Sequence, residues 1–184
     1  MEMLPGSFSP FRATRYVASV DLIDVGELVA DGVRLVLLDR DNTCVPRDTH
    51  VAPPAVKAWL ERLRSAGIAT CMFSNNFHSG EVAASAGELG CPVVDHAMKP
   101  APFSAWVAMA RMGVGPEQTV IVGDQVFTDV LAGNLAGVRT ILVRPQSRRD
   151  LWYTQLFRLG EAVVLRGVEF EGETSATSGS SGGC

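Results

Sequence analysis

Polar clusters placed directly after short apolar runs constrain the fold of this chain more than any other feature. The run 33–38 leads into Asp39-Arg40-Asp41-Asn42-Thr43 without a break. Three further runs end in the same way: 68–73 before Ser74-Asn75-Asn76, 91–94 before Lys99-Pro100, and 119–122 before Gly123-Asp124 and Asp129. Short β-rich runs bounded by turn residues are typical of buried parallel strands, and 138–143 predicts a fifth.

Helical spacing fills the segments between these runs. Apolar residues recur at i, i+3, i+4 and i+7 in the first two segments and with similar spacing in the third: Val56, Trp59, Leu60 and Leu63; Phe103, Trp106, Val107 and Ala110; Phe127, Val130, Leu131 and Leu135. Prolines stand near the starts of the first two, as at many helix N-termini. Alternating strands and helices predict an α/β fold with a central parallel sheet covered by helices on both faces.

The carboxyl ends of parallel strands meet at one edge of a sheet, and α/β proteins place their chemistry there. All four polar clusters fall at such ends. An Asp-x-Asp pair alone is weak evidence, because many surface turns contain one. Because the other three clusters fall at the same edge, the pair is interpreted as part of a candidate active site and not as a surface turn. A cation would offset the charge of the buried carboxylates there.

This set of residue types predicts phosphoryl transfer through a covalent aspartyl phosphate. Asp39 ends its strand and is the expected nucleophile, and Asp41 the general acid and base. Asp39, the backbone carbonyl of Asp41, and Asp124 are expected to hold Mg²⁺. Lys99 would neutralise charge, and Thr43, Ser74 and Asn75 would contact the phosphate. Asp129 is expected to orient Lys99 or a metal-bound water.

Composition is that of an ordinary globular α/β protein. The chain has 184 residues, of which 20% are charged and 47% hydrophobic, enough for one domain with a core. No apolar stretch reaches the roughly 18 residues that span a bilayer, and no signal peptide is evident. The cysteines show neither paired nor zinc-ligand spacing, so Cys71 is expected to be a buried apolar residue and the compartment a reducing cytoplasm.

The net charge of −4 conceals a basic stretch. Residues 139–166 carry six arginines against two carboxylates, together with Trp152, Tyr153 and Phe157. This stretch could contact an anionic membrane surface at the inner face, or it could be a terminal helix with solvated arginines. Nucleic acid is not expected to bind an acidic chain without a recognisable motif. The Ser/Gly-rich end, including Cys184, predicts disorder.

The four clusters, taken in order, resemble the motifs of the haloacid dehalogenase (HAD) phosphatase superfamily. Asp-Asn-Thr, Ser-Asn-Asn and the long fourth motif, which spans 123–134, are most similar to the YqeG-type branch of HAD subfamily IIIA. That branch includes the mitochondrial phosphatidylglycerophosphatase. The resemblance covers about residues 4–145 and implies a Rossmann-like HAD fold, Mg²⁺ dependence and a phosphomonoester substrate.

Arg40 departs from the resemblance, because this branch usually has an apolar residue there. The intervals after Thr43 and after Asn76 are too short for a folded cap domain, so the site is expected to be open. Together with the resemblance, an open site favours a large lipid phosphate, namely phosphatidylglycerophosphate, and a place in phospholipid biosynthesis. A cytosolic phosphatase for a small metabolite or a phosphoprotein remains an alternative, and an inactive scaffold that binds a partner is another. Oligomeric state does not follow from the sequence.

Four segments are expected: a lead packed on the core (1–32), the phosphatase core (33–145), a basic and aromatic segment (146–170), and a disordered tail (171–184).

Overall fold

The computed structural model describes residues 10–49, 51–75, 87, 89–94, 97–147 and 160–173. Six parallel strands form one sheet in the order β1-β6-β5-β2-β3-β4. The strands are β1 (Arg15–Val17), β2 (Leu35–Leu38), β3 (Ala69–Phe73), β4 (Val93–Val94), β5 (Thr119–Gly123) and β6 (Arg139–Val143). The larger helices are α1 (Val25–Ala30), α2 (Pro54–Ser65), α4 (Phe103–Met112) and α5 (Leu131–Ala136). The predicted α/β class is therefore confirmed.

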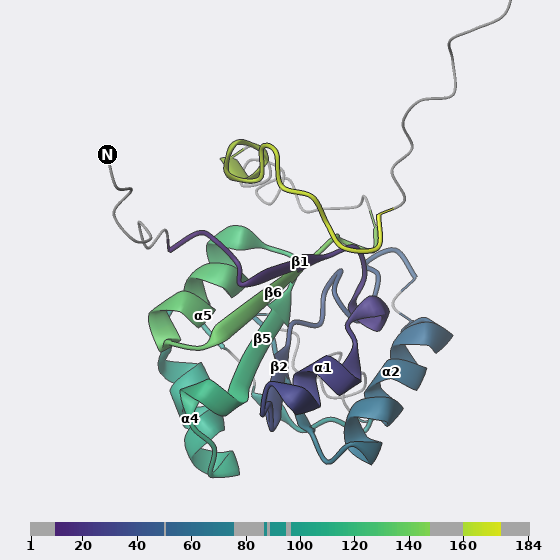
Figure 1. The fold of residues 1–184 in the computed structure, drawn as a ribbon, viewed down its shortest axis with the longest axis vertical. Helices are drawn as coiled ribbons and strands as arrows, with labels where there is room; N and C mark the ends of the chain where they lie inside the picture. Colours follow the sequence, from purple (N-terminus) through teal and green to yellow (C-terminus); the bar gives the residue numbers. More distant parts are fainter. Residues whose placement is uncertain are drawn as a thin grey trace, which may run out of the picture.

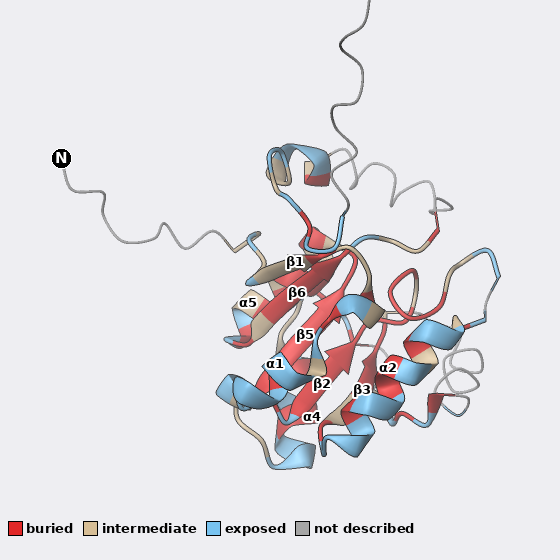
Figure 2. Ribbon diagram, turned by 45° about the vertical axis from the view of Figure 1, so that its right-hand side comes forward, coloured by how far each residue is buried: buried red, intermediate tan, exposed pale blue. Residues whose placement is uncertain are grey.

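Helices cover both faces of the sheet (Figure 1). Val36 and Leu38 of β2 pack in a core with α1 and α2, whereas Leu35 and Leu37 pack in a second core with α4 and α5. Successive side chains of a strand point to opposite faces, so a strand buried on both sides reads as an unbroken apolar run. Figure 2 shows the central strands buried and the outer helix surfaces exposed.

The lead segment supplies a strand that the apolar runs did not predict. β1 pairs in parallel with β6 at the sheet edge, with Tyr16 opposite Leu142. Residues 160–173 return to the same edge, where Phe170 packs beside Tyr16 and the backbone of Glu171 bonds that of Ala18. Three residues are too few to show a recognisable strand period, so pairing with a formed sheet decides this element.

α2 buries the four residues that its spacing predicted, and the indole N–H of Trp59 donates to the Ile23 carbonyl at 2.9 Å. The predicted face of α4 is wrong. Phe103, Trp106 and Val107 are exposed, and the helix instead buries Ala105, Ala108 and Met109. α4 is apolar on most sides, so periodicity cannot choose between two apolar stripes. Small alanines let the helix approach the sheet closely.

The third predicted apolar face, which runs from Phe127 to Leu135, is also partly wrong. Its last member, Leu135, is 52% exposed. A π-helical turn spans Val126–Val130 before α5 begins. Such a turn inserts one extra residue, so a count by 3.6-residue periods falls out of phase after it. α5 ends at Ala136, and the next residue, Gly137, has a left-handed φ of 77°, the conformation in which many helices terminate.

Close packing of α5 on β6 depends on Gly133. A Cβ on this residue would lie 2.2 Å from Cγ2 of Thr140. Because Thr140 is β-branched and buried, it cannot turn away freely. We expect Gly133→Ala to lower the free energy of unfolding by about 1–3 kcal/mol through overpacking, measured by urea denaturation.

Gly87→Ala is the matched control, because a Cβ there meets nothing within 4 Å. It should leave the urea midpoint nearly unchanged. Equal midpoints for the two variants would contradict the packing argument.

Candidate active site

A buried lysine joins two buried carboxylates at the carboxyl edge of the sheet. Nζ of Lys99 lies 2.6 Å from Oδ1 of Asp39 and 2.6 Å from Oδ1 of Asp129. All three side chains are less than 10% exposed. The pKa of Lys99 is raised although burial opposes this, because Asp129 and Asp39 both favour its charged form.

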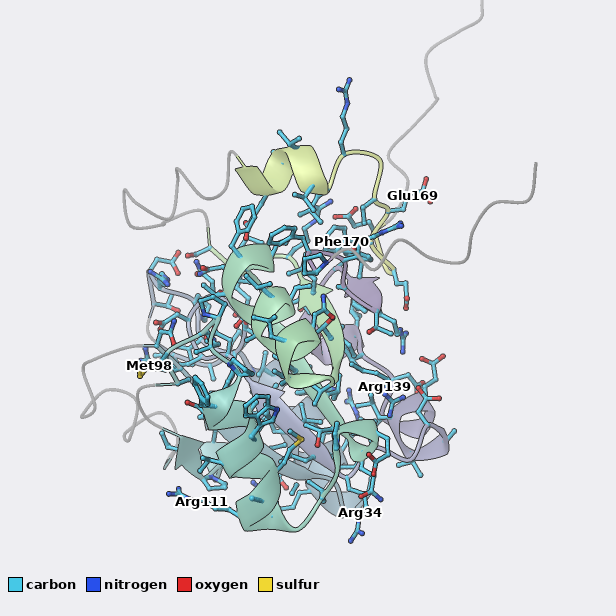
Figure 3. The ribbon with its side chains drawn as sticks, turned by 90° about the vertical axis from the view of Figure 1, so that its left-hand side faces the viewer. Arg34, Met98, Arg111, Arg139, Glu169 and Phe170 are labelled. Carbon is cyan, nitrogen blue, oxygen red and sulfur yellow. The ribbon has the colours of Figure 1, made fainter. Side chains whose placement is uncertain are left out.

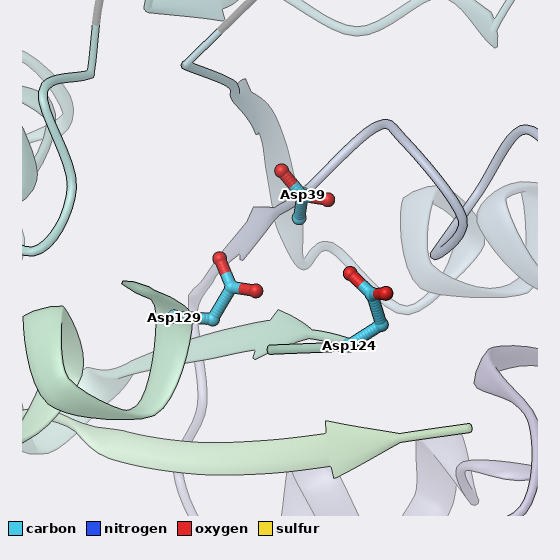
Figure 4. A group of neighbouring side chains, drawn as sticks. All are labelled: Asp39, Asp124 and Asp129. Atoms are coloured by element: carbon cyan, nitrogen blue, oxygen red, sulfur yellow. The ribbon is translucent and has the colours of Figure 1, made fainter. Parts of the chain in front are cut away.

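Strand register brings the carboxylates together. Leu38 pairs with Val122, and the Asp39 N–H donates to the Val122 carbonyl at 2.9 Å. Asp39 and Asp124 therefore leave adjacent strands at nearly the same height. Figure 4 shows these two side chains and Asp129 turned toward a common centre.

Asp129 reaches this centre from the π-helical turn. Its second carboxylate oxygen accepts from the Gln125 N–H at 3.1 Å. A Cβ on Gly123 would lie 2.2 Å from the Asp129 carboxyl carbon. Glycine at this position thus leaves the space that the Asp129 side chain fills.

Asp39, Asp124 and Asp129 offer one oxygen each, all within 4.8 Å of one another. With Lys99, the buried group carries a formal charge of −2, which one divalent cation would balance. Burial, opposed by Lys99 and reinforced by Asp129 and Asp41, raises the pKa of Asp39 to about 7. An all-oxygen donor set with excess negative charge fits Mg²⁺. Asp129 faces the same centre, although its two oxygens already accept from Lys99 and from the Gln125 N–H.

Asn75 holds the backbone of Lys99 on both sides. Its amide nitrogen donates to the Lys99 carbonyl at 2.9 Å, and its amide oxygen accepts from the Lys99 N–H at 2.8 Å. We expected Asn75 to contact phosphate, and the second hydrogen of its side-chain amide remains for that contact. Ser74 is buried beside it, and its carbonyl accepts from the Ala97 N–H.

The loop after Asp39 is held by residues that follow β6, which lies two strands from β2 in the sheet. Asn42 has a φ of 62°, a left-handed conformation that Asn tolerates. Its side-chain oxygen accepts from the Ser147 hydroxyl at 2.7 Å, and Gln146 bonds the Thr43 carbonyl. Sequence reasoning missed both residues, since neither belongs to a motif. Thr43 Oγ1 is buried and has no hydrogen-bond partner among the described residues.

Two arginines flank Asp41. Nη1 of Arg40 lies 2.6 Å from Asp41 Oδ1, and Nη2 of Arg47 lies 3.9 Å from Asp41 Oδ2. The unusual Arg40 is thus a buried partner of the expected acid and base. Arg47 was not singled out from the sequence.

Glu161, also missed, is 3% exposed and accepts from the Val126 N–H at the start of the π-helical turn. A carboxylate there satisfies a helix N-terminal donor. Arg139 and Arg144 of the basic stretch pair with Asp31 and Glu173. The aromatic residues of that stretch, its remaining arginines except Arg166, and Ser175 to Cys184 lie outside the described residues.

A HAD-hydrolase-like family model matches residues 96–156. The chain is 32% identical over 162 residues to "Probable phosphatase YqeG" of Bacillus subtilis, covering 88% of this chain and 94% of the relative. It is 28% identical over 142 residues to "Phosphatidylglycerophosphate phosphatase 1, chloroplastic/mitochondrial" of Arabidopsis thaliana. That match covers 73% of this chain but only 41% of the longer plant protein.

The fold is similar to that of the cobalt-bound deoxy-D-mannose-octulosonate 8-phosphate phosphatase of Haemophilus influenzae. The TM-score is 0.50 at 16% identity, over 74% of this chain and 89% of that protein. The match to the Bacillus protein covers nearly all of both chains, and it agrees with the carboxylates at the strand ends. The chain therefore belongs to the YqeG-type family of HAD-like phosphatases.

Proposed function

We propose that this chain hydrolyses a phosphomonoester through a covalent phosphate on Asp39. The observation that carries the proposal is the Lys99 ammonium held between Asp39 and Asp129 beside Asp124. A lysine in this position offsets the charge of an incoming phosphate, and the carboxylates supply a nucleophile and cation ligands.

Asp39 suits the nucleophilic role because only one of its oxygens is engaged. Oδ1 accepts from Lys99, and no described residue donates to Oδ2. Oδ2 would attack phosphorus as the bond to the leaving alcohol breaks. The hydroxyl of Thr43, buried without a partner among the described residues, could donate to a phosphate oxygen.

Asp41 would donate a proton to the leaving oxygen and then accept one from the water that attacks the aspartyl phosphate. That second step breaks the bond between phosphorus and Asp39 and releases inorganic phosphate. Asp129 holds Lys99 in line with Asp39, and Asn75 fixes the backbone of that lysine. Mg²⁺ would be held by Asp39, Asp124 and the backbone carbonyl of Asp41, and it would neutralise charge at the phosphoryl group.

The proposed substrate is a lipid phosphate, namely phosphatidylglycerophosphate. The name of the Arabidopsis relative supports this choice, and so does an apolar surface beside the site. Met98, next to Lys99, points away from the molecule (Figure 3) and is 71% exposed. Phe103 and Trp106 at the start of α4 are 67% and 45% exposed. Exposed apolar groups beside a site mouth suit substrate held in a membrane. No helix in the described ranges is long and apolar enough to cross one.

Replacement of the nucleophile tests the covalent mechanism. Asp39→Asn preserves shape but removes the attacking charge, so kcat on p-nitrophenyl phosphate should fall by roughly four orders of magnitude or more. Asp31→Asn, at an exposed carboxylate that pairs with Arg139 at the start of β6 and therefore lies at the opposite edge of the sheet, is the control and should retain activity. Substantial turnover by Asp39→Asn, with a native circular dichroism spectrum, would exclude Asp39 as the nucleophile.

Removal of the cation tests the metal site. EDTA should abolish turnover and Mg²⁺ should restore it, whereas Ca²⁺ should support it poorly because its coordination is larger and looser. Asp124→Asn should weaken Mg²⁺ binding in a calorimetric titration, and Asp31→Asn should not. Full activity in EDTA would rule out this role for the carboxylates.

Substrate presentation tests the lipid assignment and separates it from a soluble metabolite or phosphoprotein. Phe103→Ser should lower the hydrolysis of phosphatidylglycerophosphate in anionic vesicles about tenfold relative to p-nitrophenyl phosphate, because the aromatic ring would no longer enter the headgroup layer. Val29→Ser is the control, because it also replaces an exposed apolar side chain by serine, here at a residue of α1 that is 50% exposed. It should leave the ratio of lipid hydrolysis to p-nitrophenyl phosphate hydrolysis unchanged. Hydrolysis of soluble esters alone would favour the alternative.

A further inference from the structure

We infer that Arg47 forms an anion subsite for a second negatively charged group on the substrate, carried by the leaving alcohol. This inference rests on the proposed function. A phosphomonoester needs only the site around Asp39, whereas phosphatidylglycerophosphate also carries a phosphodiester one glycerol unit away. Arg47 lies on the side of the site where that glycerol would leave.

The position of Arg47 follows from the loop between Asp41 and α2. Its backbone N–H donates to the Asn42 side chain at 3.3 Å, so the residue is tied to the same loop as Asp41. Its guanidinium approaches Asp41, the residue assigned to the leaving oxygen, at 3.9 Å. A group attached to the leaving alcohol would therefore pass close to it.

The neighbouring carboxylates do not need the positive charge of Arg47 for their neutralisation. Asp41 is already neutralised by Arg40 at 2.6 Å. The contact from Arg47 to Asp41 is much longer, and it is the one ion pair that Arg47 makes among the described residues. Asp39, Asp124, Asp129 and Lys99 would be balanced by a divalent cation. Among the residues that the structure describes, one positive charge is thus left over beside Asp41.

The guanidinium is also short of hydrogen bonds. Nε of Arg47 is buried and has no partner among the described residues. The side chain as a whole is 20% exposed, so atoms other than Nε are open to a ligand. A buried N–H without an acceptor is costly, and a phosphodiester oxygen would satisfy it. Guanidinium groups bind such oxygens through two parallel N–H donors.

Two soluble substrates separate this role from lipid binding and from catalysis. Glycerophosphoglycerophosphate, the deacylated form of the proposed substrate, carries a phosphomonoester and a phosphodiester. Glycerol 3-phosphate carries the phosphomonoester alone. We expect the wild-type protein with Mg²⁺ to prefer the first in kcat/KM. Arg47→Gln should reduce that preference about tenfold or more, the equivalent of one charge-assisted hydrogen bond.

Arg47→Lys should retain part of the preference, since it keeps the charge but loses the paired donors. Arg111→Gln, an arginine substitution at the distant end of α4, should leave the preference unchanged. Glycerophosphoglycerol should inhibit wild-type turnover of glycerol 3-phosphate competitively and inhibit Arg47→Gln at least tenfold more weakly.

The outcomes are distinguishable. If the wild type prefers the two-phosphate substrate and Arg47→Gln keeps that preference, the subsite is overturned and the proposed function stands. The same conclusion follows if Arg47→Gln slows both substrates equally, since the arginine then acts through Asp41. If the wild type hydrolyses both esters without preferring the first, the subsite is overturned and the proposed function stands. If it hydrolyses neither, and also fails on p-nitrophenyl phosphate and on phosphatidylglycerophosphate in vesicles, the proposed function fails and the inference fails with it.

Discussion

The ion pairs of Lys99 with Asp39 and Asp129 are the interaction on which the rest of this structure depends. Each of these charges is costly to bury alone, and removing one partner leaves the others uncompensated. Three carboxylates against one lysine still leave excess negative charge, so the fold holds the site in a form that a divalent cation would complete. The parallel sheet makes this possible, because adjacent strands end at the same height and fix Asp39 and Asp124 before any ligand arrives.

Residues outside the motifs hold this cluster in place. Asn75 fixes the Lys99 backbone, Gln146 and Ser147 hold the loop that carries Asn42, and Glu161 satisfies a donor at the turn that carries Asp129. Most of these contacts join segments far apart in the chain. The segment 160–173 and β1 pack together at one edge of the sheet, so the two ends of the described chain meet there.

The surface around the site differs from its centre. The centre is a buried set of charges common to phosphoryl chemistry, whereas the mouth combines exposed apolar groups at Met98 and Phe103 with the surplus charge of Arg47. Phe103 is exposed because α4 faces the sheet with its alanines. The same packing that lets the helix approach the sheet closely therefore turns its large side chains outward.

The sequence by itself determined the class of fold and the identity of the central charged residues. Unbroken apolar runs predict strands buried on both faces, and polar clusters after them predict one reactive edge. The face of α4, the phase of α5, the pairing of β1 and the positions of Arg40, Arg47, Asn75 and Glu161 were decided only by the tertiary structure. Periodicity is local: it cannot choose between two apolar stripes, follow a helix through a π-helical turn, or report a contact between residues a hundred positions apart. Those features depend on the shape of the surface against which each segment packs, and that surface exists only once the sheet has formed.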